Sequence, residues 1–337
     1  MAQLDPQQVH VRVMETRSPA YRFAQGASFA AWQKTARARL GELLALDAIP
    51  GAPGDVEIVD TRDRDGYHET KFNFRTEPDY SVAAHLLVPQ GRKNPPVVIC
   101  LQGHASGMHI SLGRPKYAED AEDIAEDRDY ALQAVRKGFA ALAMEQRGFG
   151  ENGGDEHGPQ CRLPASTALL IGRTLIGERV HDVMSAVTLL RSGLFPVDAG
   201  RVAITGNSGG GTTSIYAAAM DERLSLSMPC CAFTSFLASI GCSAHCFCNY
   251  IPGIARDFDM GDLCMLIAPR PLVILVARKD PSFPLPQAEE QFELVRRGSE
   301  AGGAPDNCVL IPAPGGHRYY ADLAWPAFDS LSGWEKA

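Results

Sequence analysis

Val202-Ala203-Ile204-Thr205-Gly206-Asn207-Ser208-Gly209-Gly210 is the stretch that decides the fold, and residues 214–220 continue it with a helix-forming segment. Its first three residues are apolar, and together with Thr205 they predict a buried strand. The next five match Gly-x-Ser-x-Gly between a predicted strand and a predicted helix, where this motif presents a serine on a strained turn. Ser208 is therefore predicted to be a nucleophile. The alternative is an ordinary loop rich in glycine and serine.

The segments around this turn predict an α/β fold with a mostly parallel central sheet and helices on both of its faces. Residues 56–59, 69–75 and 82–88 alternate or run apolar between turn residues, and they predict antiparallel opening strands. From residue 97 onward, apolar runs alternate with segments of helical spacing, as in parallel strands joined by helices. We expect these strands at 97–101, 139–144, 202–205, 224–228, 271–276 and 308–311. We expect helices at 28–46, 129–137, 175–190 and 214–220.

Acidic side chains crowd residues 119–129. A run of like charges is usually solvated, so we expect a loop or a helix face in contact with water. A cation site is the alternative interpretation of the same residues.

The length and composition are those of one large globular domain. The chain has 337 residues, of which 45% are apolar and 21% charged. We expect a single domain over 1–337, with an N-terminal helical extension at 1–55 and a catalytic core at 56–337. The formal net charge of -8 gives no general attraction for nucleic acid or for anionic lipid. Small neutral molecules are the expected partners, and a homo-oligomer is compatible with the sequence.

The sequence predicts a cytoplasmic protein. The first residues lack the basic and apolar regions of a secretory signal, and no stretch is long and apolar enough to span a bilayer. Nine cysteines are present, an odd number, and several lie in strongly apolar segments. Reduced thiols explain this usage better than a disulfide framework does. An exported protein with a trimmed leader is the alternative.

A nucleophilic serine requires a base to take its proton and a carboxylate to orient that base. Asp280 lies in the loop after the predicted strand at 271–276, and His317 follows the last predicted strand and a glycine pair. The order serine, aspartate, histidine is the order that this fold uses. His317 is the only histidine downstream of Asp280. We therefore expect Asp280 to be the acid and His317 the base, although aspartate before proline is also frequent in turns.

Acyl transfer builds a negative charge on the carbonyl oxygen, and two preorganised N–H groups are needed to stabilise it. The residue after the nucleophile, Gly209, is expected to supply one. The second is expected from the loop after the strand at 97–101, from the backbone of His104 or of Gly103. The alternative is that this loop is an ordinary turn that contains glycine.

Three thiols and an imidazole lie close together in the sequence, at Cys242, His245, Cys246 and Cys248. These are ligand types that zinc prefers, but the spacing is not that of a common structural zinc site. We therefore predict no metal and no cofactor, and a packed, reduced loop near the active site. A metal-binding protein centred on this segment is the alternative.

From about Val56 onward the chain resembles bacterial α/β-hydrolases of the dienelactone-hydrolase-like and acetyl xylan esterase-like group. The resemblance rests on six segments: Leu101-Gln102-Gly103-His104, Arg147-Gly148-Phe149-Gly150, Gly206 to Gly210, the Asp280 loop, Gly316-His317 and residues 245–253.

This resemblance implies the α/β-hydrolase fold and cofactor-free esterase activity, often deacetylation of sugars. It implies substrate contacts for Gln102, Arg147 and Tyr250, although Arg147 is also suited to bracing the loops through an ion pair, or to the surface. Two residues depart from the pattern. Dienelactone hydrolases proper have cysteine in the elbow where this chain has Ser208, and many relatives have histidine where it has Gln102.

The predicted function is hydrolysis of small esters, of which acetyl esters are the leading candidates, through an acyl-enzyme on Ser208. A peptidase or amidase could use the same three residues. A binding protein that keeps the scaffold without catalysis is a third reading, which an intact set of catalytic groups disfavours.

Overall fold

The computed structural model describes residues 4–51 and 54–334. Residues 1–3 and 335–337 therefore lie outside the described residues. The prediction of no secretory signal begins at the first of these segments, and the predicted single domain, 1–337, includes both. Within the described ranges, nine strands form one sheet in the order β1-β2-β3-β5-β4-β6-β7-β8-β9. The strands are β1 Val56–Arg64, β2 Tyr67–Glu77, β3 Tyr80–Pro89, β4 Pro96–Leu101, β5 Ala140–Met144, β6 Asp198–Asn207, β7 Leu224–Cys230, β8 Leu272–Ala277 and β9 Cys308–Ala313.

The sheet is antiparallel at one edge and parallel in the remainder. β1, β2, β3 and β5 pair antiparallel, whereas all pairs from β5 through β4 to β9 are parallel. The α/β-hydrolase fold predicted from the sequence is therefore confirmed. Because the carboxyl ends of parallel strands meet at one edge, the loops after β4, β6, β8 and β9 converge there.

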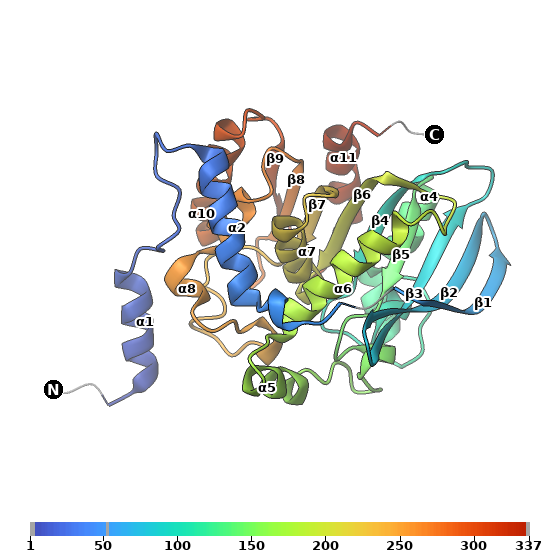
Figure 1. The fold of residues 1–337 in the computed structure, drawn as a ribbon, viewed down its shortest axis with the longest axis horizontal. Coiled ribbons are helices and arrows are strands. Elements are labelled where there is room, and N and C mark those ends of the chain that lie inside the picture. Colours follow the sequence, from blue (N-terminus) through green and yellow to red (C-terminus); the bar gives the residue numbers. More distant parts are fainter. Residues whose placement is uncertain (1–3, 52–53, 335–337) are drawn as a thin grey trace.

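Helices cover both faces of the sheet (Figure 1). α2, α6 and α7 cover one face, and α4 and α11 cover the other. The predicted helices at 28–46, 129–137, 175–190 and 214–220 are confirmed, with α7 beginning earlier than expected, at Gly209. The helices are α1 Pro6–Thr16, α2 Phe29–Leu44, α3 Asp120–Asp123, α4 Tyr130–Arg136, α5 Arg162–Leu170, α6 Leu175–Leu190, α7 Gly209–Met220, α8 Ile254–Asp257, α9 Met260–Met265, α10 Leu285–Ala301 and α11 Ala321–Ser332.

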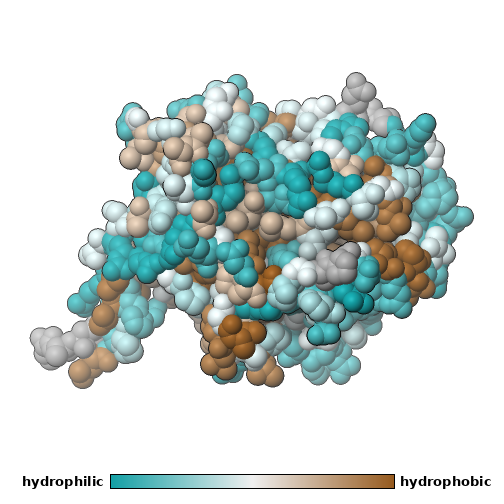
Figure 2. Space-filling model, in the orientation of Figure 1, coloured by the Kyte–Doolittle hydropathy of each residue, from teal (hydrophilic) through white to brown (hydrophobic). Residues whose placement is uncertain are grey.

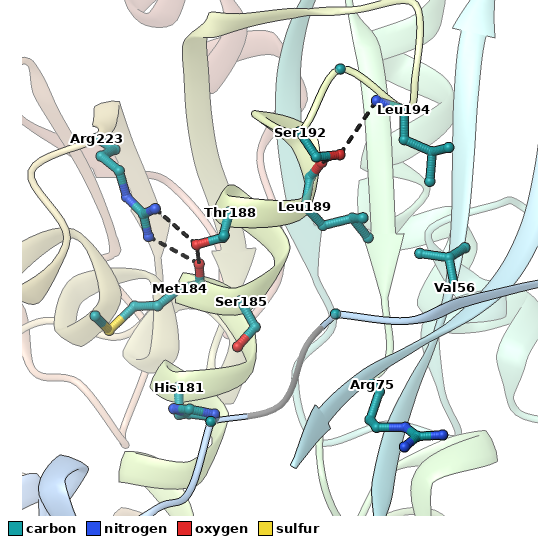
Figure 3. A pocket seen from close by; sticks show the side chains of 13 residues that line it. Val56, Arg75, His181, Met184, Ser185, Thr188, Leu189, Ser192, Leu194 and Arg223 are labelled. Carbon is teal, nitrogen blue, oxygen red and sulfur yellow. Dashed lines mark hydrogen bonds between the residues drawn. The ribbon is translucent and has the colours of Figure 1, made fainter. Parts of the chain in front are cut away.

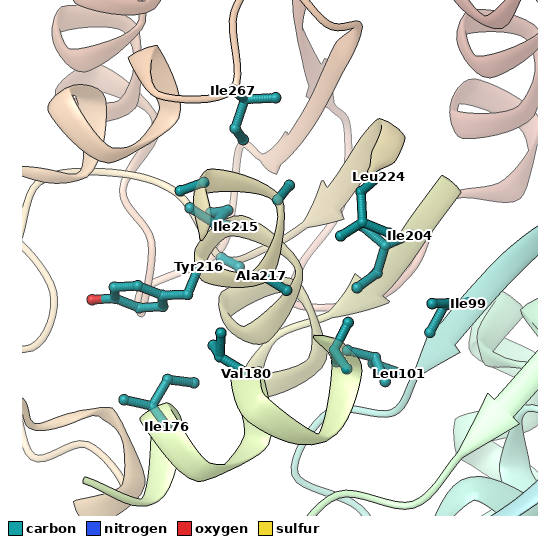
Figure 4. Close-up of a cluster of buried hydrophobic side chains, with 14 of the residues drawn as sticks. Ile99, Leu101, Ile176, Val180, Ile204, Ile215, Tyr216, Ala217, Leu224 and Ile267 are labelled. Carbon is teal, nitrogen blue, oxygen red and sulfur yellow. The ribbon is translucent and has the colours of Figure 1, made fainter. Parts of the chain in front are cut away.

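The core forms because alternate residues of each buried strand point to opposite faces of the sheet. In β4, Ile99 and Leu101 pack toward α6 and α7, while Val98 and Cys100 pack toward α4 and α11. Figure 4 shows the first of these two layers, in which the apolar side chains of α6 and α7 meet those of β4 and β6. The central strands are thereby held in place by both helical layers.

The N-terminal extension is joined to the core through α2. Ala36, Leu40 and Leu44 are fully buried in the same cluster as α6 and α7. α1 has no buried residue and lies at the edge of the molecule, away from the sheet (Figure 1).

The prediction of a solvated acidic stretch at 119–129 is wrong for Asp120. Its carboxylate is 2% exposed and accepts hydrogen bonds from the backbone N–H groups of Lys116 and Tyr117, at 2.7 and 2.8 Å. Ser106 and His109, which follow β4, also contact it. Asp120 therefore anchors the loop after β4, a contact that charge pattern alone does not reveal.

One helix presents an apolar face to solvent. Leu163, Leu170 and Ile171, in α5 and directly after it, are exposed and form part of the hydrophobic surface at the lower side of Figure 2. Among the described residues, no helix has both the length and the hydropathy that crossing a bilayer requires.

Candidate active site

Ser208 lies on the sharp turn between β6 and α7. Its backbone has φ 54° and ψ -120°, a conformation that costs a residue with a side chain about 1–3 kcal/mol. The Ser208 N–H donates to the Cys230 carbonyl oxygen of the neighbouring strand at 2.9 Å. The hydroxyl is thereby raised at the carboxyl edge of the sheet, where the sequence motif predicted it.

The glycines of the motif are required because the turn leaves no space for larger residues. A Cβ atom on Gly210 would lie 2.0 Å from the Leu101 carbonyl oxygen, and one on Gly206 would lie 2.5 Å from the Gly210 carbonyl carbon. Both distances are far below van der Waals contact. The close approach of α7 to β4 therefore selects these residues.

Gly210→Ala is expected to lower the free energy of unfolding by at least about 3 kcal/mol, because the added methyl group collides with backbone that cannot rotate away. Gly316→Ala is the matched control, since a Cβ atom there would meet nothing within 4 Å. Urea unfolding followed by circular dichroism measures both variants. Equal stability of the two variants would show that α7 does not approach β4 as closely as described.

His317 and Asp280 form a hydrogen-bonded pair beside this turn. The His317 Nδ1 atom lies 2.7 Å from Asp280 Oδ2, and the Ser282 N–H donates to Asp280 Oδ1 at 2.9 Å. The Asp280 carboxylate is fully buried, whereas the His317 side chain is 30% exposed. Burial acts to raise the pKa of Asp280, but the hydrogen bond and charge of His317 outweigh it and lower this pKa below its ordinary value. The pair is arranged as an ionised carboxylate that orients an imidazole.

A cavity of about 300 Å³ brings Ser208 and His317 together. Its wall is formed by loops at the carboxyl edge of the sheet and by the first turn of α7. The lining residues are His104, Ser208, Gly209, Thr212, Ala244, His245, Cys246, Asn249, Ser282, Phe283 and His317. The Phe283 and His317 rings stack with their centroids 6.0 Å apart, which helps to hold the imidazole in position.

The predicted N–H donors lie next to Ser208. Gly209 is the first residue of α7, so its N–H has no acceptor within the helix. A Cβ atom on Gly103 would lie 3.1 Å from the Ser208 Cβ atom, so the loop after β4 contacts the serine directly. In the part of the chain that the structure describes, the N–H groups of Gly103 and His104 donate to no protein acceptor. The N–H groups of Gly103, His104 and Gly209 are therefore not taken up by the hydrogen bonds of the described residues.

None of the three predicted substrate contacts lies on the cavity wall. Gln102 is buried, and its Nε2 atom donates to Ser111 Oγ at 2.7 Å and to the Arg128 carbonyl oxygen at 2.8 Å. Tyr250 is partly exposed, and its hydroxyl donates to the Ile240 carbonyl oxygen at 3.4 Å.

Arg147 is buried in a network of ion pairs. Its guanidinium forms two hydrogen bonds of 2.8 Å to Asp182 and one of 2.6 Å to Glu77, and it lies 4.1 Å from the centre of the Tyr80 ring. Of the three roles considered from the sequence, the ion pairs favour that of a brace, which joins the loop after β5 to β2 and α6.

Sequence reasoning missed the residues that shape the cavity wall. Ser282 and Phe283 follow Asp280 by two and three residues, so their place in the acid loop was a usable signal. Thr212 follows Ser208 by one helical turn, which was also a usable signal. Ala244 and Asn249 carried no signal of their own, because only the folding of a distant loop brings them to Ser208.

Four ligand-type side chains gather at one edge of the same cavity: His104, Cys161, Cys246 and Cys248. Their ligand atoms all lie within 4.8 Å of one another, and His104 Nε2 is 3.1 Å from Cys248 Sγ. Burial lowers the pKa of His104, but its hydrogen bonds with Cys246 and Cys248 outweigh burial and raise the pKa to about 9. Cys242 and His245, which the sequence placed in this cluster, lie outside the group.

A larger cavity of about 850 Å³ lies between α6 and the strands β1 and β2 (Figure 3). Its charged and titratable side chains already have partners. Arg223 pairs with Asp221, and His181 Nε2 contacts the Thr76 carbonyl oxygen at 2.9 Å. None of the residues predicted for catalysis lines it, so the smaller cavity is the candidate active site.

Comparisons with known proteins find similarity to hydrolases. A model of an abhydrolase family matches residues 6–168, a segment that contains His104 and Cys161 and ends before Ser208. YtaP of Bacillus subtilis (strain 168), designated a hydrolase, is 25% identical over 257 residues, which are 74% of this chain and 83% of that protein.

Solved structures with the same fold include proteins designated as esterases. One from Bacteroides fragilis NCTC 9343, designated an acetyl xylan esterase, superposes with a TM-score of 0.82 at 18% identity and covers 98% of this chain and 96% of its own. A glucuronoyl esterase from Solibacter usitatus has a TM-score of 0.65 at 15% identity, with coverage of 94% and 96%. These likenesses establish the fold.

Proposed function

The chain has the α/β-hydrolase fold, and on that premise we propose that it is a serine carboxylesterase that hydrolyses small acyl esters, acetyl esters above all. One observation carries this proposal. Ser208, on its strained turn, and His317, hydrogen-bonded to buried Asp280, line the same small cavity. That combination supplies a nucleophile, a base and a group that orients the base.

In the first half of the reaction, the Ser208 hydroxyl oxygen attacks the ester carbonyl carbon while His317 Nε2 takes the hydroxyl proton. No hydrogen bond joins these two side chains in the described residues, and such bonds often tighten only around substrate. The carbonyl oxygen becomes negatively charged and accepts hydrogen bonds from the Gly209 N–H and from the His104 or Gly103 N–H. His317 then gives its proton to the departing alcohol.

In the second half, water attacks the acyl group on Ser208, and His317 takes a proton from that water. The carboxylic acid leaves, and the proton returns to the serine oxygen. Asp280 stays ionised throughout, because the lowered pKa of its carboxyl group keeps it in the charged form at neutral pH. Its charge stabilises the protonated imidazole that forms twice in each cycle.

The size of the cavity supports a short acyl group. At about 300 Å³ it is at the lower end of the range for ligand sites, and Phe283 and Asn249 form part of its wall. The likeness to a protein designated an acetyl xylan esterase supports carbohydrate acetyl esters as substrates. All nine cysteines are free thiols, which supports a cytoplasmic location as part of this proposal.

The kcat/KM for p-nitrophenyl acetate is expected to exceed that for the octanoate ester by at least about tenfold, because the longer chain cannot enter so small a cavity. A spectrophotometric assay of the acetate, butyrate and octanoate esters measures this preference. The matched amide, p-nitroacetanilide, is the control for bond type. Faster cleavage of the amide would favour the peptidase or amidase reading, and cleavage of neither would favour a noncatalytic binding protein.

A further inference from the structure

The cluster of His104, Cys161, Cys246 and Cys248 is built from three separate parts of the chain. His104 follows β4, Cys161 directly precedes α5, and the other two cysteines lie in the long loop between β7 and α8. α5 contacts the short turn Phe247–Asn249 in that loop. Four reactive side chains are therefore brought together by the tertiary fold and not by one local turn.

The donor set is that of a structural zinc site. Three thiolates and one imidazole are a common four-coordinate combination for zinc, with Zn–S distances of about 2.3 Å. A tetrahedron of that size places its ligand atoms roughly 3.5–3.8 Å apart. The four ligand atoms already lie within 4.8 Å of one another, and two of the cysteines, Cys161 and Cys248, are almost fully buried. Only small shifts of side chains would complete the tetrahedron.

A buried arginine beside the cluster provides an independent observation. Arg179 is 1% exposed, and its Nη2 atom lies 3.1 Å from Cys161 Sγ and 2.6 Å from the Arg147 carbonyl oxygen. Its guanidinium also lies over the Phe149 ring, 4.4 Å from the ring centre. Among the described residues Arg179 has no carboxylate partner, and its Nη1 atom has no hydrogen-bond partner.

A buried guanidinium is costly unless a nearby negative charge compensates it. Zinc binding displaces the protons of its ligands, including the one that the thiols otherwise hold on His104. Three thiolates and a neutral histidine around one divalent cation then carry a net charge of minus one. That charge balances Arg179. Three neutral thiols, or a disulfide between two of them, would leave the arginine without compensation.

We propose that His104, Cys161, Cys246 and Cys248 bind one zinc ion in a closed, four-coordinate site beside the Ser208 cavity. The ion ties the loop after β4 to α5 and to the loop before α8. It also holds the His104 ring against the elbow, where a Cβ atom on Gly209 would lie 2.8 Å from His104 Cε1. All four positions of the ion are taken by protein, so it shapes the wall of the cavity and takes no part in the reaction. The proposal is independent of the esterase assignment.

Elemental analysis of the purified wild-type protein is expected to find about one zinc ion per chain. Cys161→Ser and Cys248→Ser are each expected to lower the content to below roughly 0.2, because a closed site loses affinity when a thiolate is removed. Cys242→Ser is the matched control. Cys242 lies in the same loop but is exposed and outside the cluster, so this variant should keep the full content.

X-ray absorption at the zinc edge of the wild-type protein tests the same site without any substitution, in case the serine variants fail to fold. The expected shell has three sulfur neighbours and one nitrogen neighbour. A wild-type zinc content near zero after growth in zinc-supplemented medium would overturn the proposal. A shell of oxygen and nitrogen alone, or a disulfide between two of the three cysteines found by mass spectrometry, would do the same. None of these measurements uses ester hydrolysis, so zinc binding can be established even if the protein has no esterase activity.

Discussion

Ser208→Ala is expected to lower kcat for p-nitrophenyl acetate by at least about 10⁴-fold, because no other hydroxyl can form the acyl-enzyme at this position. The loss should appear mainly in kcat, since the cavity wall and the N–H donors that position the ester remain. The alanine keeps the strained backbone of the turn, so the unfolding free energy should change little. Steady-state kinetics and urea unfolding of the same preparations measure the two effects.

Ser330→Ala is the matched control, because Ser330 is an exposed serine on α11 that does not line the cavity. It should retain wild-type kinetics. A fluorophosphonate reagent that labels activated serines should modify the wild-type protein and the control once per chain, and should fail to modify Ser208→Ala. Activity that survives in a correctly folded Ser208→Ala protein would identify a different nucleophile.

Asp280→Asn is expected to lower kcat by roughly 10³–10⁴-fold without removing the nucleophile. The asparagine amide would donate a hydrogen bond to His317 Nδ1, where the carboxylate now accepts one at 2.7 Å. The imidazole would then carry its proton on Nε2, facing Ser208, and could no longer accept the serine proton. Kinetics with p-nitrophenyl acetate, together with the rate of labelling by the fluorophosphonate, measure the effect: labelling should slow but still reach completion.

Asp306→Asn, in the exposed loop before β9, is the control for the same chemical change and should leave kcat unchanged.

The free energy of unfolding provides a second measurement, because the pKa of Asp280 is lowered in the folded protein. A depressed folded pKa contributes stability at neutral pH that is lost as the pH falls through the lowered value. The difference in free energy of unfolding between wild type and Asp280→Asn should therefore become smaller as the pH is lowered. Full activity in Asp280→Asn, or a difference that becomes larger in acid, would exclude Asp280 as the orienting group.

The base in this mechanism is the neutral imidazole of His317, since a protonated ring cannot accept the serine proton. The proposed zinc ion would also hold the loop after β4 in place beside Ser208. His104 would be held through its side chain by the metal, and its backbone N–H is one of the two proposed alternatives for the second donor to the developing charge.

The sequence by itself determined the strands, four of the helices and the order of Ser208, Asp280 and His317, but it did not predict α10, the longest helix. These features are local: a buried strand shows as an apolar run, and a strained elbow requires glycine at fixed positions. The residues that follow parallel strands then lie close together, because the carboxyl ends of these strands are at the same edge of the sheet. Periodicity and chain order were therefore sufficient for the fold and for the proposed catalytic residues.

Only the tertiary structure decided which side chains surround those residues. Gln102, Arg147 and Tyr250 lie in the loops that sequence analysis selected, yet their side chains bond elsewhere, because the direction of a loop side chain depends on distant partners such as Ser111 and Asp182. The cysteine cluster likewise could not be predicted from the sequence alone. Its spacing argued against a metal because Cys161 and His104, which complete the donor set, are distant in sequence and meet the loop before α8 only in the folded chain.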